Sequence, residues 1–261
     1  MALVVKFGGN AMTDPSTGAA VAAQLRQLAK QGLDPIVVHG GGPFIAQALD
    51  EAGLEHRFLR GLRVTTEESL PVIERVLTML GKTLAQEIGS AIALTGRDAN
   101  LLTAVQFDPA LGRVGRMVGV NTAAVRALLA AGFTPVIGCL AQDRDAQGAV
   151  LNVNADEVAG AVAGGLNVPL IFLTNVPGVL DDPIDPDSVL AEISRTEIEA
   201  RIEDGRIAGG MIPKVEAGLH ALDQGVPYTV IADGRQPNIL QQVVSGRAGT
   251  RVFTDTEAEA G

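Results

Sequence analysis

The sequence predicts an α/β protein with a three-layer, open, mainly parallel twisted sheet and helices on both of its faces. Short runs of Val, Ile and Leu alternate along the chain with segments of helical periodicity. Runs that are apolar throughout are typical of strands buried on both faces, as in parallel sheets. The chain has 261 residues, of which 47% are hydrophobic, so it can enclose such a sheet within one domain, residues 1–261.

The elements of this sheet can be placed in order. Residues 3–5 form the first buried strand, which ends at Gly8-Gly9, and a helix near residues 19–30 follows it. Residues 36–38 form the second strand, which ends at Gly40-Gly41-Gly42, and Pro43 opens a helix at its first position. The remaining strands are expected at residues 101–107, 114–120, 134–138, 149–153, 169–174, 228–231 and 251–253, and the remaining helices at residues 66–88, 196–204 and 213–224.

Two helix starts carry capping patterns. Thr65 and Glu68 have the spacing of a capping box for the long helix that ends near residue 88. Asn154 can cap the helix after residues 149–153, with Glu157 at the reciprocal position.

Charge and composition exclude several classes of function. The net charge is −10, which repels nucleic acid and anionic membranes at long range. Cys139 is the single cysteine, so no intrachain disulfide can form. The sequence has no signal-peptide pattern and no apolar run of the ~20 residues that span a bilayer. We therefore expect a cytoplasmic protein that binds neither nucleic acid nor membrane.

The glycine clusters are the main candidates for a ligand site. Both follow buried strands, and ligands of open α/β sheets bind at the carboxyl ends of the strands. Glycine lets backbone N–H groups approach an anion closely. Lys6 lies two residues before the first cluster, and it cannot cheaply stay buried without a partner. Two clusters beside a lysine favour a phosphate-transfer site over two tight turns, although Lys6 can also be an edge-strand residue that reaches water.

Three more charged residues are candidates for the same ligand site. Lys214 lies at a helix start, where it opposes the helix dipole unless an anion is near. Asp156 can pair with one or both lysines, or simply complement a helix dipole. Arg63 can clamp a carboxylate through two hydrogen bonds, or lie free on the surface.

Other chemistries lack their signatures. Neither the P-loop nor the dinucleotide fingerprint is present, nor a serine nucleophile elbow. His56 and His220 have no acidic or Cys partners at zinc spacing. His39 fits a buried turn better than a catalytic base, and Cys139 fits a small core residue.

Taken together, these motifs resemble the amino acid kinase superfamily, in particular its N-acetylglutamate kinase branch. The resemblance runs over about residues 4–253. It rests on the order and spacing of seven segments: Val5-Lys6-Phe7-Gly8-Gly9-Asn10, Val38-His39-Gly40-Gly41-Gly42-Pro43, Gly61-Leu62-Arg63-Val64-Thr65, Thr95-Gly96-Arg97-Asp98, Asn152-Val153-Asn154-Ala155-Asp156, Asn175-Val176-Pro177-Gly178-Val179 and Gly209-Gly210-Met211-Ile212-Pro213-Lys214-Val215.

The resemblance implies ATP-dependent phosphorylation of the γ-carboxylate of N-acetylglutamate, a step of arginine biosynthesis. Lys6 and Lys214 would stabilise the transferring phosphoryl group and Asp156 would hold both lysines, while amides of Gly9 and Gly41 bind phosphoryl oxygens. A lobe of about residues 1–168 would bind N-acetylglutamate, and one of about residues 169–261 would bind ATP. The implied substrate residues are Gly41, Gly42, Arg63 and Asn152. The implied nucleotide residues are Asn175, Val176, Pro177, Gly178, Val179, Leu180, Gly209, Gly210, Met211 and Lys214, within residues 175–180 and 206–214.

No protein ligand is expected for Mg²⁺, which the ATP phosphates and water would hold. The chemistry agrees with this set of residues, because a carboxylate is already a nucleophile and transfer requires mainly alignment and charge neutralisation. One departure concerns Asn175, which stands where the family often has Asp, so its nucleotide contact is an open question. Phe7 replaces a more usual aliphatic residue.

Three alternatives remain open. A kinase for carrier-protein-linked aminoadipate or glutamate would need a basic docking patch on a chain of net charge −10. A catalytically dead amino acid sensor need not keep Lys6, Lys214 and Asp156. An oxidoreductase lacks its fingerprint.

The helix over residues 66–88 carries more apolar positions than one buried stripe needs, with Glu74, Arg75 and Lys82 on its solvated side. A second apolar face suggests an isologous dimer interface, and the resemblance implies the same. Because the first strand begins near residue 3, we expect no N-terminal helix of the kind found in arginine-inhibited hexamers. The expectation is a homodimer insensitive to arginine.

Overall fold

The computed structural model describes residues 1–8, 14–185 and 187–255 and confirms the predicted fold class. An eight-stranded sheet has the order β12-β14-β13-β11-β1-β2-β8-β5, and all its neighbouring pairs are parallel except β13 and β14. The strands are β1 (Ala2–Phe7), β2 (Asp34–His39), β5 (Ala91–Leu94), β8 (Thr134–Gly138), β11 (Leu170–Thr174), β12 (Glu192–Ser194), β13 (Thr229–Asp233) and β14 (Thr250–Phe253).

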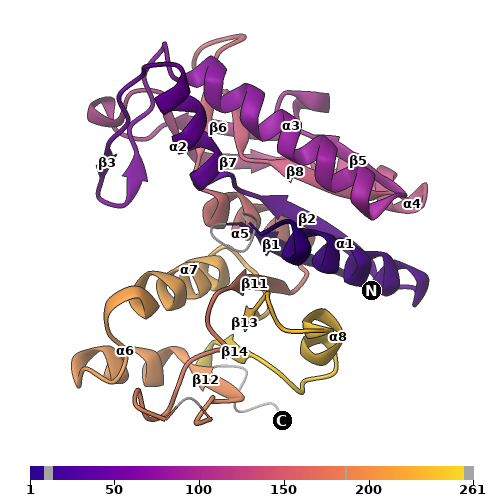
Figure 1. Ribbon diagram of the computed structural model, residues 1–261, viewed down its shortest axis with the longest axis vertical. Coiled ribbons are helices and arrows are strands. Elements are labelled where there is room, and N and C mark those ends of the chain that lie inside the picture. The colour runs from indigo at the N-terminus through magenta and orange to yellow at the C-terminus, as the bar shows by residue number, and fades with distance from the viewer. Residues whose placement is uncertain (9–13, 186, 256–261) are drawn as a thin grey trace.

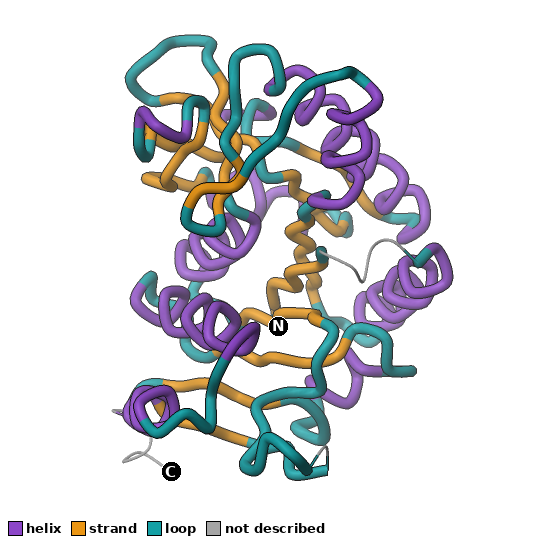
Figure 2. The backbone as a smooth tube through the Cα atoms, turned by 60° about the vertical axis from the view of Figure 1, so that its left-hand side comes forward, coloured by secondary structure: helices purple, strands orange, loops and turns teal. Residues whose placement is uncertain are grey.

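Helices cover both faces of the sheet (Figure 2). One face packs against helices α4 (Thr122–Ala130), α5 (Ala155–Leu166) and α7 (Ile212–Asp223), and the other against α1 (Pro15–Lys30), α3 (Leu70–Ile88) and α8 (Ile239–Val244). Aliphatic residues that alternate along each strand fill the two cores between sheet and helices. For example, Val38 belongs to the α5 side, whereas Val37 belongs to the α1–α3 side.

Smaller elements extend the two ends of the molecule (Figure 1). Four strands, β6 (Leu102–Gln106), β7 (Val114–Val120), β9 (Leu140–Asp143) and β10 (Val150–Val153), close into a small barrel. Helix α2 (Gly42–Glu51) packs on α3, and a hairpin of β3 (Phe58–Leu59) and β4 (Leu62–Arg63) follows α2. Helix α6 (Arg195–Glu203) lies at the opposite end (Figure 1). None of the helices in the described ranges is long and apolar enough to cross a membrane.

The long helix begins later than predicted, and its predicted capping box is wrong. Thr65 is fully buried, and its backbone bonds Leu111 and Arg113 instead of starting the helix. The reciprocal bonds form one residue later: the Ser69 N–H donates to Thr66 Oγ1 at 3.1 Å, and the Thr66 N–H donates to Ser69 Oγ at 2.8 Å. Glu68 has no part in this pair, and α3 starts at Leu70.

The second predicted cap is half correct. The side chain of Asn154 caps α5 by accepting the Asp156 N–H at 2.7 Å, as expected. The reciprocal role of Glu157 is wrong, because its Oε1 accepts the Met117 N–H of β7 at 2.7 Å. A tertiary contact with the barrel has therefore taken the place of the local one, and it anchors the first turn of α5.

Candidate active site

Two glycine loops meet at the carboxyl edge of the sheet, because β1 and β2 are adjacent and parallel. The Gly40 N–H donates to the Phe7 carbonyl at 3.2 Å, which ties the second loop to the end of β1. Gly41 then caps α2, and a Cβ at Gly41 would lie 2.9 Å from a methyl of Leu80 in α3. A side chain at Gly41 would therefore require the Leu80 side chain to move, which favours glycine here. Gly9, the other predicted source of an amide, lies outside the described residues.

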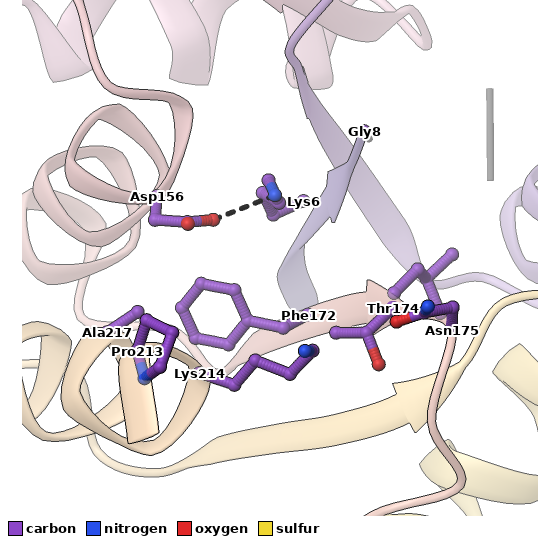
Figure 3. Close-up of a pocket in the computed structure, with 10 residues that line it drawn as sticks. Lys6, Gly8, Asp156, Phe172, Thr174, Asn175, Pro213, Lys214 and Ala217 are labelled. Atoms are coloured by element: carbon purple, nitrogen blue, oxygen red, sulfur yellow. Dashed lines mark ion pairs between the residues drawn. The ribbon is translucent and has the colours of Figure 1, made fainter. Parts of the chain in front are cut away.

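Lys6 and Asp156 form an ion pair between the sheet and α5, with 2.9 Å between Nζ and Oδ1 (Figure 3). The Lys6 side chain is 17% exposed and that of Asp156 is 35% exposed. Lys6 is on β1, and Asp156 lies in the first turn of α5. The pairing satisfies an ammonium group that would be costly to bury alone. The sequence hypothesis that Asp156 pairs with a lysine is thus confirmed for Lys6.

Lys214 approaches the same pocket from the start of α7 but does not reach Asp156. Its ammonium donates to the Gly210 carbonyl at 2.8 Å, one helical turn back. In Figure 3 its side chain extends below Phe172, apart from the Lys6–Asp156 pair. The expectation that Asp156 holds both lysines is therefore not met in this structure. Two ammonium groups nevertheless line one pocket, which suits a polyanionic ligand.

This first pocket lies between β1, β11 and the start of α7. Of the residues predicted to bind a nucleotide, Asn175 and Lys214 line it. Val179 is instead buried in a core cluster with Val176 and Met211 packed against that cluster. The N–H of Val179 bonds Thr250 Oγ1 at 2.8 Å, so this backbone group is already satisfied. The remaining predicted nucleotide residues, Pro177, Gly178, Leu180, Gly209 and Gly210, do not line the pocket.

A second pocket lies on the other side of the ion pair. The predicted substrate residues Gly41, Gly42, Arg63 and Asn152 all line it. The Arg63 Nη2 donates to the Gly42 carbonyl at 3.0 Å, and its guanidinium lies 4.7 Å from the centre of the Phe58 ring. These contacts fix the guanidinium over the glycine loop.

One nitrogen of the Arg63 guanidinium is available to bind a ligand. Its Nη1 is buried and has no hydrogen-bond partner among the described residues. Burial lowers the pKa of Arg63 from its ordinary value, and the charge of Asp50 offsets part of this effect. A buried donor without a partner costs about 1–3 kcal/mol, so a carboxylate ligand at Nη1 would relieve the penalty.

Asn152 provides an acceptor in the same pocket. Its Nδ2 donates to Thr65 Oγ1 at 3.0 Å, which orients the amide and leaves Oδ1 for another donor. Asn152 lies on β10, two residues before Asn154, which caps α5. The pocket thus combines a cationic donor at Arg63 with a neutral acceptor at Asn152.

The ion pair is the wall common to both pockets, since Lys6 and Asp156 line each of them. Among the residues that the structure describes, neither His39 nor Cys139 is suited to act as a general base beside it. His39 is buried, and burial lowers the pKa of its imidazole. Burial raises the pKa of the Cys139 thiol to about 12. The arrangement can bind two anionic ligands and neutralise charge between them, but it cannot readily remove a proton.

Several lining residues were not predicted from sequence. Phe172 and Thr174 of β11 line the first pocket with Ala217 of α7, and Phe58 lines the second. Phe172 belongs to a strand that is apolar throughout, so its sequence does not separate the pocket lining from the core. Phe58 is 58% exposed, and only its contact with Arg63 reveals a role.

The chain is similar to one known class of phosphotransferases. Residues 1–233 match the family model described as the amino acid kinase family. A crystal structure of smu.665 from Streptococcus mutans UA159 covers 97% of this chain and 98% of its own, with a TM-score of 0.79 and 28% identity. The chain therefore belongs to the amino acid kinase family.

Relatives narrow the assignment within that family. Acetylglutamate kinase of Deinococcus radiodurans is 50% identical over 250 residues, which is 96% of this chain and 99% of the relative. Acetylglutamate kinase of Thermus thermophilus is 44% identical over 253 residues, 95% of this chain and 97% of the relative. Within the amino acid kinases, the chain is thus a member of the acetylglutamate kinase branch.

Proposed function

We propose that this protein transfers the γ-phosphoryl group of ATP to the γ-carboxylate of N-acetyl-L-glutamate, giving N-acetylglutamyl phosphate and ADP in arginine biosynthesis. The single observation that carries the proposal is the Lys6–Asp156 pair shared by two pockets. A phosphoryl group can pass between two ligands only where their sites meet. The names of the similar kinases support this choice of substrate.

The acceptor would lie in the second pocket. Its α-carboxylate would take the free Nη1 of Arg63, and its amide N–H would donate to Asn152 Oδ1. The γ-carboxylate would then face the Gly41 and Gly42 amides beside Lys6. Free glutamate carries an ammonium in place of the amide and lacks the acetyl group, so it would leave the pocket incompletely filled.

ATP would lie in the first pocket, against Asn175 and the start of α7. Lys214 would release the Gly210 carbonyl for a phosphate oxygen, and Lys6 would neutralise charge on the transferring group from the other side. Asp156 would position Lys6. The amides of Gly9 and Gly41 are proposed to bind phosphoryl oxygens. The rest of the 175–180 and 209–211 segments would support this pocket from behind.

Mg²⁺ is proposed to arrive with ATP, held by phosphates and water. In the part of the chain that the structure describes, no group of three His, Cys, Asp or Glu side chains is placed to hold a metal ion. Asp156, the carboxylate that lines both pockets, is paired with Lys6.

The positions of the pockets support the proposal of two lobes. Every residue that lines the second pocket lies between Lys6 and Asp156, within the proposed acceptor lobe of about residues 1–168. The first pocket adds residues from Phe172 to Ala217, within the proposed ATP lobe of about residues 169–261. The cytoplasm, where ATP is abundant, is the compartment we propose for this enzyme.

We also propose a homodimer built on α3 and β5. β5 is an end strand of the sheet, and Ala91–Leu94 are all only half-buried. On α3, Val72, Val76 and Met79 share one helical face, and Met79 is 61% exposed. An exposed apolar position on a helix and an open sheet edge each suit a two-fold contact between identical subunits.

A hydroxamate assay, which traps acyl phosphates, tests the reaction. With ATP and Mg²⁺, N-acetylglutamate should give product, whereas glutamate, aspartate and aminoadipate should give at most a hundredth of that rate. Phosphorylation of glutamate at the same rate would refute the acceptor assignment. Activity only on a carrier-linked acceptor would favour the carrier-dependent kinase, and binding without turnover would favour a sensor.

A further inference from the structure

His39 is the last residue of β2, directly before the glycine loop, and it has no role in the reaction proposed above. Its side chain is 1% exposed. Its parallel neighbour across the sheet is Gly138 of β8. Because Val37 faces the α1–α3 side, His39 two residues later faces the same side.

Two glycines form a slot for the imidazole. A Cβ at Gly81 would lie 2.9 Å from His39 Nε2, and a Cβ at Gly138 would lie 3.4 Å from the same atom. Gly81 lies in the interior of α3, where glycine is less favourable than alanine. The ring occupies the space that an alanine methyl would need, which explains the glycine.

The imidazole also holds the loop. Its Nδ1 lies 3.0 Å from the Gly40 carbonyl. A carbonyl oxygen only accepts, so Nδ1 carries the proton and Nε2 of the neutral ring does not. Nε2 is buried and has no hydrogen-bond partner among the described residues.

The preceding peptide, between His39 and Gly40, is held at both of its polar groups. The Cys139 thiol donates to the His39 carbonyl at 2.9 Å, and the Gly40 N–H donates to Phe7. Gly41 follows at once, against Leu80 of α3. The Gly41 N–H belongs to the Gly40–Gly41 peptide, whose carbonyl the imidazole holds, so the direction of this N–H depends on that bond and on the distance to α3.

We infer that His39 is a positioning residue for the phosphoryl-binding loop, braced in the Gly81–Gly138 slot so that its Nδ1–H fixes Gly40 and thereby aims the Gly41 amide. This inference rests on the proposed function, in which the Gly41 amide binds the transferring group. A shift of about 1 Å in such a group can lower a rate about 100-fold. His39 itself need not touch either substrate.

Two variants of His39 separate positioning from packing. The amide nitrogen of asparagine can lie where Nδ1 lies, so His39→Asn keeps the donor but leaves part of the slot empty. His39→Leu fills the slot without a donor. We expect His39→Leu to lower kcat at least tenfold with little change in either KM. His39→Asn should lower the Tm but keep kcat within about threefold of wild type.

Substitution of Gly81, which forms one wall of the slot, tests the slot itself. Gly81→Ala should lower kcat about tenfold or more, because the methyl displaces the ring. The double variant Gly81→Ala/His39→Asn should recover most of that loss, since the shorter side chain leaves room for the methyl. Gly18→Ala is the matched control, because a Cβ in that helix would meet only a carboxylate oxygen at 4.0 Å.

Wild-type kcat in His39→Leu or Gly81→Ala would overturn the inference, as would a double variant no faster than Gly81→Ala. If Gly81→Ala does not fold, the tautomer of the His39 imidazole in the wild-type protein tests the inference. Nitrogen-15 NMR of the wild-type protein at neutral pH should show His39 protonated at Nδ1 alone, and a proton on Nε2 would refute the brace. Absence of acetylglutamate phosphorylation by the wild-type protein would refute the proposed function instead, and it would leave the tautomer result intact.

Discussion

Lys6 Nζ lies 2.9 Å from Asp156 Oδ1, and this pair separates the two pockets while lining both. Lys6 comes from the second-last position of β1, and Asp156 from the second residue of α5. A strand and a helix 150 positions apart in the chain thus place opposite charges at the one point where two bound anions would meet.

Lys6→Ala should lower kcat by roughly 10²–10³-fold, with smaller changes in KM, because it removes a charge that matters most in the transition state. Lys214→Ala should do the same. Steady-state hydroxamate kinetics measure both effects. Lys30→Ala, an exposed lysine at the end of α1, is the control. A near-normal kcat in either variant would remove that lysine from the mechanism.

Asp156→Asn should lower kcat less than Lys6→Ala does. The substitution keeps the side-chain shape and a hydrogen-bond acceptor, but it no longer offsets the charge of the half-buried ammonium. If Asp156 acts only by positioning Lys6, the double variant Lys6→Ala/Asp156→Asn should be no slower than Lys6→Ala alone. Additive losses in the double variant would show that Asp156 acts separately.

Arg63→Lys should raise the KM for N-acetylglutamate by roughly 10–100-fold and leave the KM for ATP unchanged. The lysine ammonium cannot reproduce the planar fork that bonds Gly42 and keeps Nη1 free. Initial rates with each substrate varied in turn give both constants. Arg60→Lys in the same hairpin, where the side chain is 73% exposed, should change neither constant. An unaltered KM in Arg63→Lys would contradict the clamp.

Glu157→Gln should become more stable relative to wild type as the pH rises. Burial raises the pKa of Glu157 above its ordinary 4.5, against smaller lowering effects of the Met117 N–H, Arg116 and His220. The folded protein then binds the proton more tightly than the unfolded chain. The favourable contribution is complete below the ordinary pKa and is lost as the pH rises through the raised one.

Glutamine keeps the acceptor for Met117 and does not ionise, so the variant avoids that loss. Urea unfolding of both proteins, from about pH 4 to pH 8, measures the difference in the free energy of unfolding. A difference that does not vary with pH would show that the carboxyl of Glu157 titrates alike in the folded and unfolded chain.

Met79→Asp should dissociate the proposed dimer without unfolding the subunit, because the side chain is 61% exposed in the single chain. A charge buried at an apolar two-fold contact is costly and occurs twice. Sedimentation equilibrium gives the mass. Ile184→Asp, on a loop where the side chain is 91% exposed, should leave the assembly unchanged. A monomeric wild type, or a dimer that tolerates Met79→Asp, would exclude this interface.

The strands that carry the site were predictable because their signals are local. Residues 36–38 are β-branched and end in three glycines, and residues 134–138 match β8 as observed. Weaker elements were missed for physical reasons. β5 has only four residues, two of them alanine, and α8 has six residues and starts from Asn238 in a left-handed conformation without a side-chain cap.

Within the site, the need of a buried charge for a partner was easier to predict than the hydrogen bonds of particular side chains. A lysine inside an apolar strand requires a partner, so the Lys6–Asp156 pair could be anticipated. Lys214 could not be placed in the same way, because its bond to Gly210 depends on how the preceding turn folds. The predicted caps at Thr65 and Glu157 failed similarly, since tertiary hydrogen bonds to Leu111, Arg113 and Met117 replaced the local pattern.

The shared ion pair has a consequence for inhibitor design. Two pockets that open onto the same two side chains can be filled by one molecule, a bisubstrate compound that joins an adenosine polyphosphate to an acylated glutamate. Linking the halves turns the second binding event into an intramolecular one, so affinity can rise about 10²–10⁴-fold over either half. The best linker would match the span of the phosphates that cross between Lys6 and Lys214, and shortening or lengthening it would measure that span in solution.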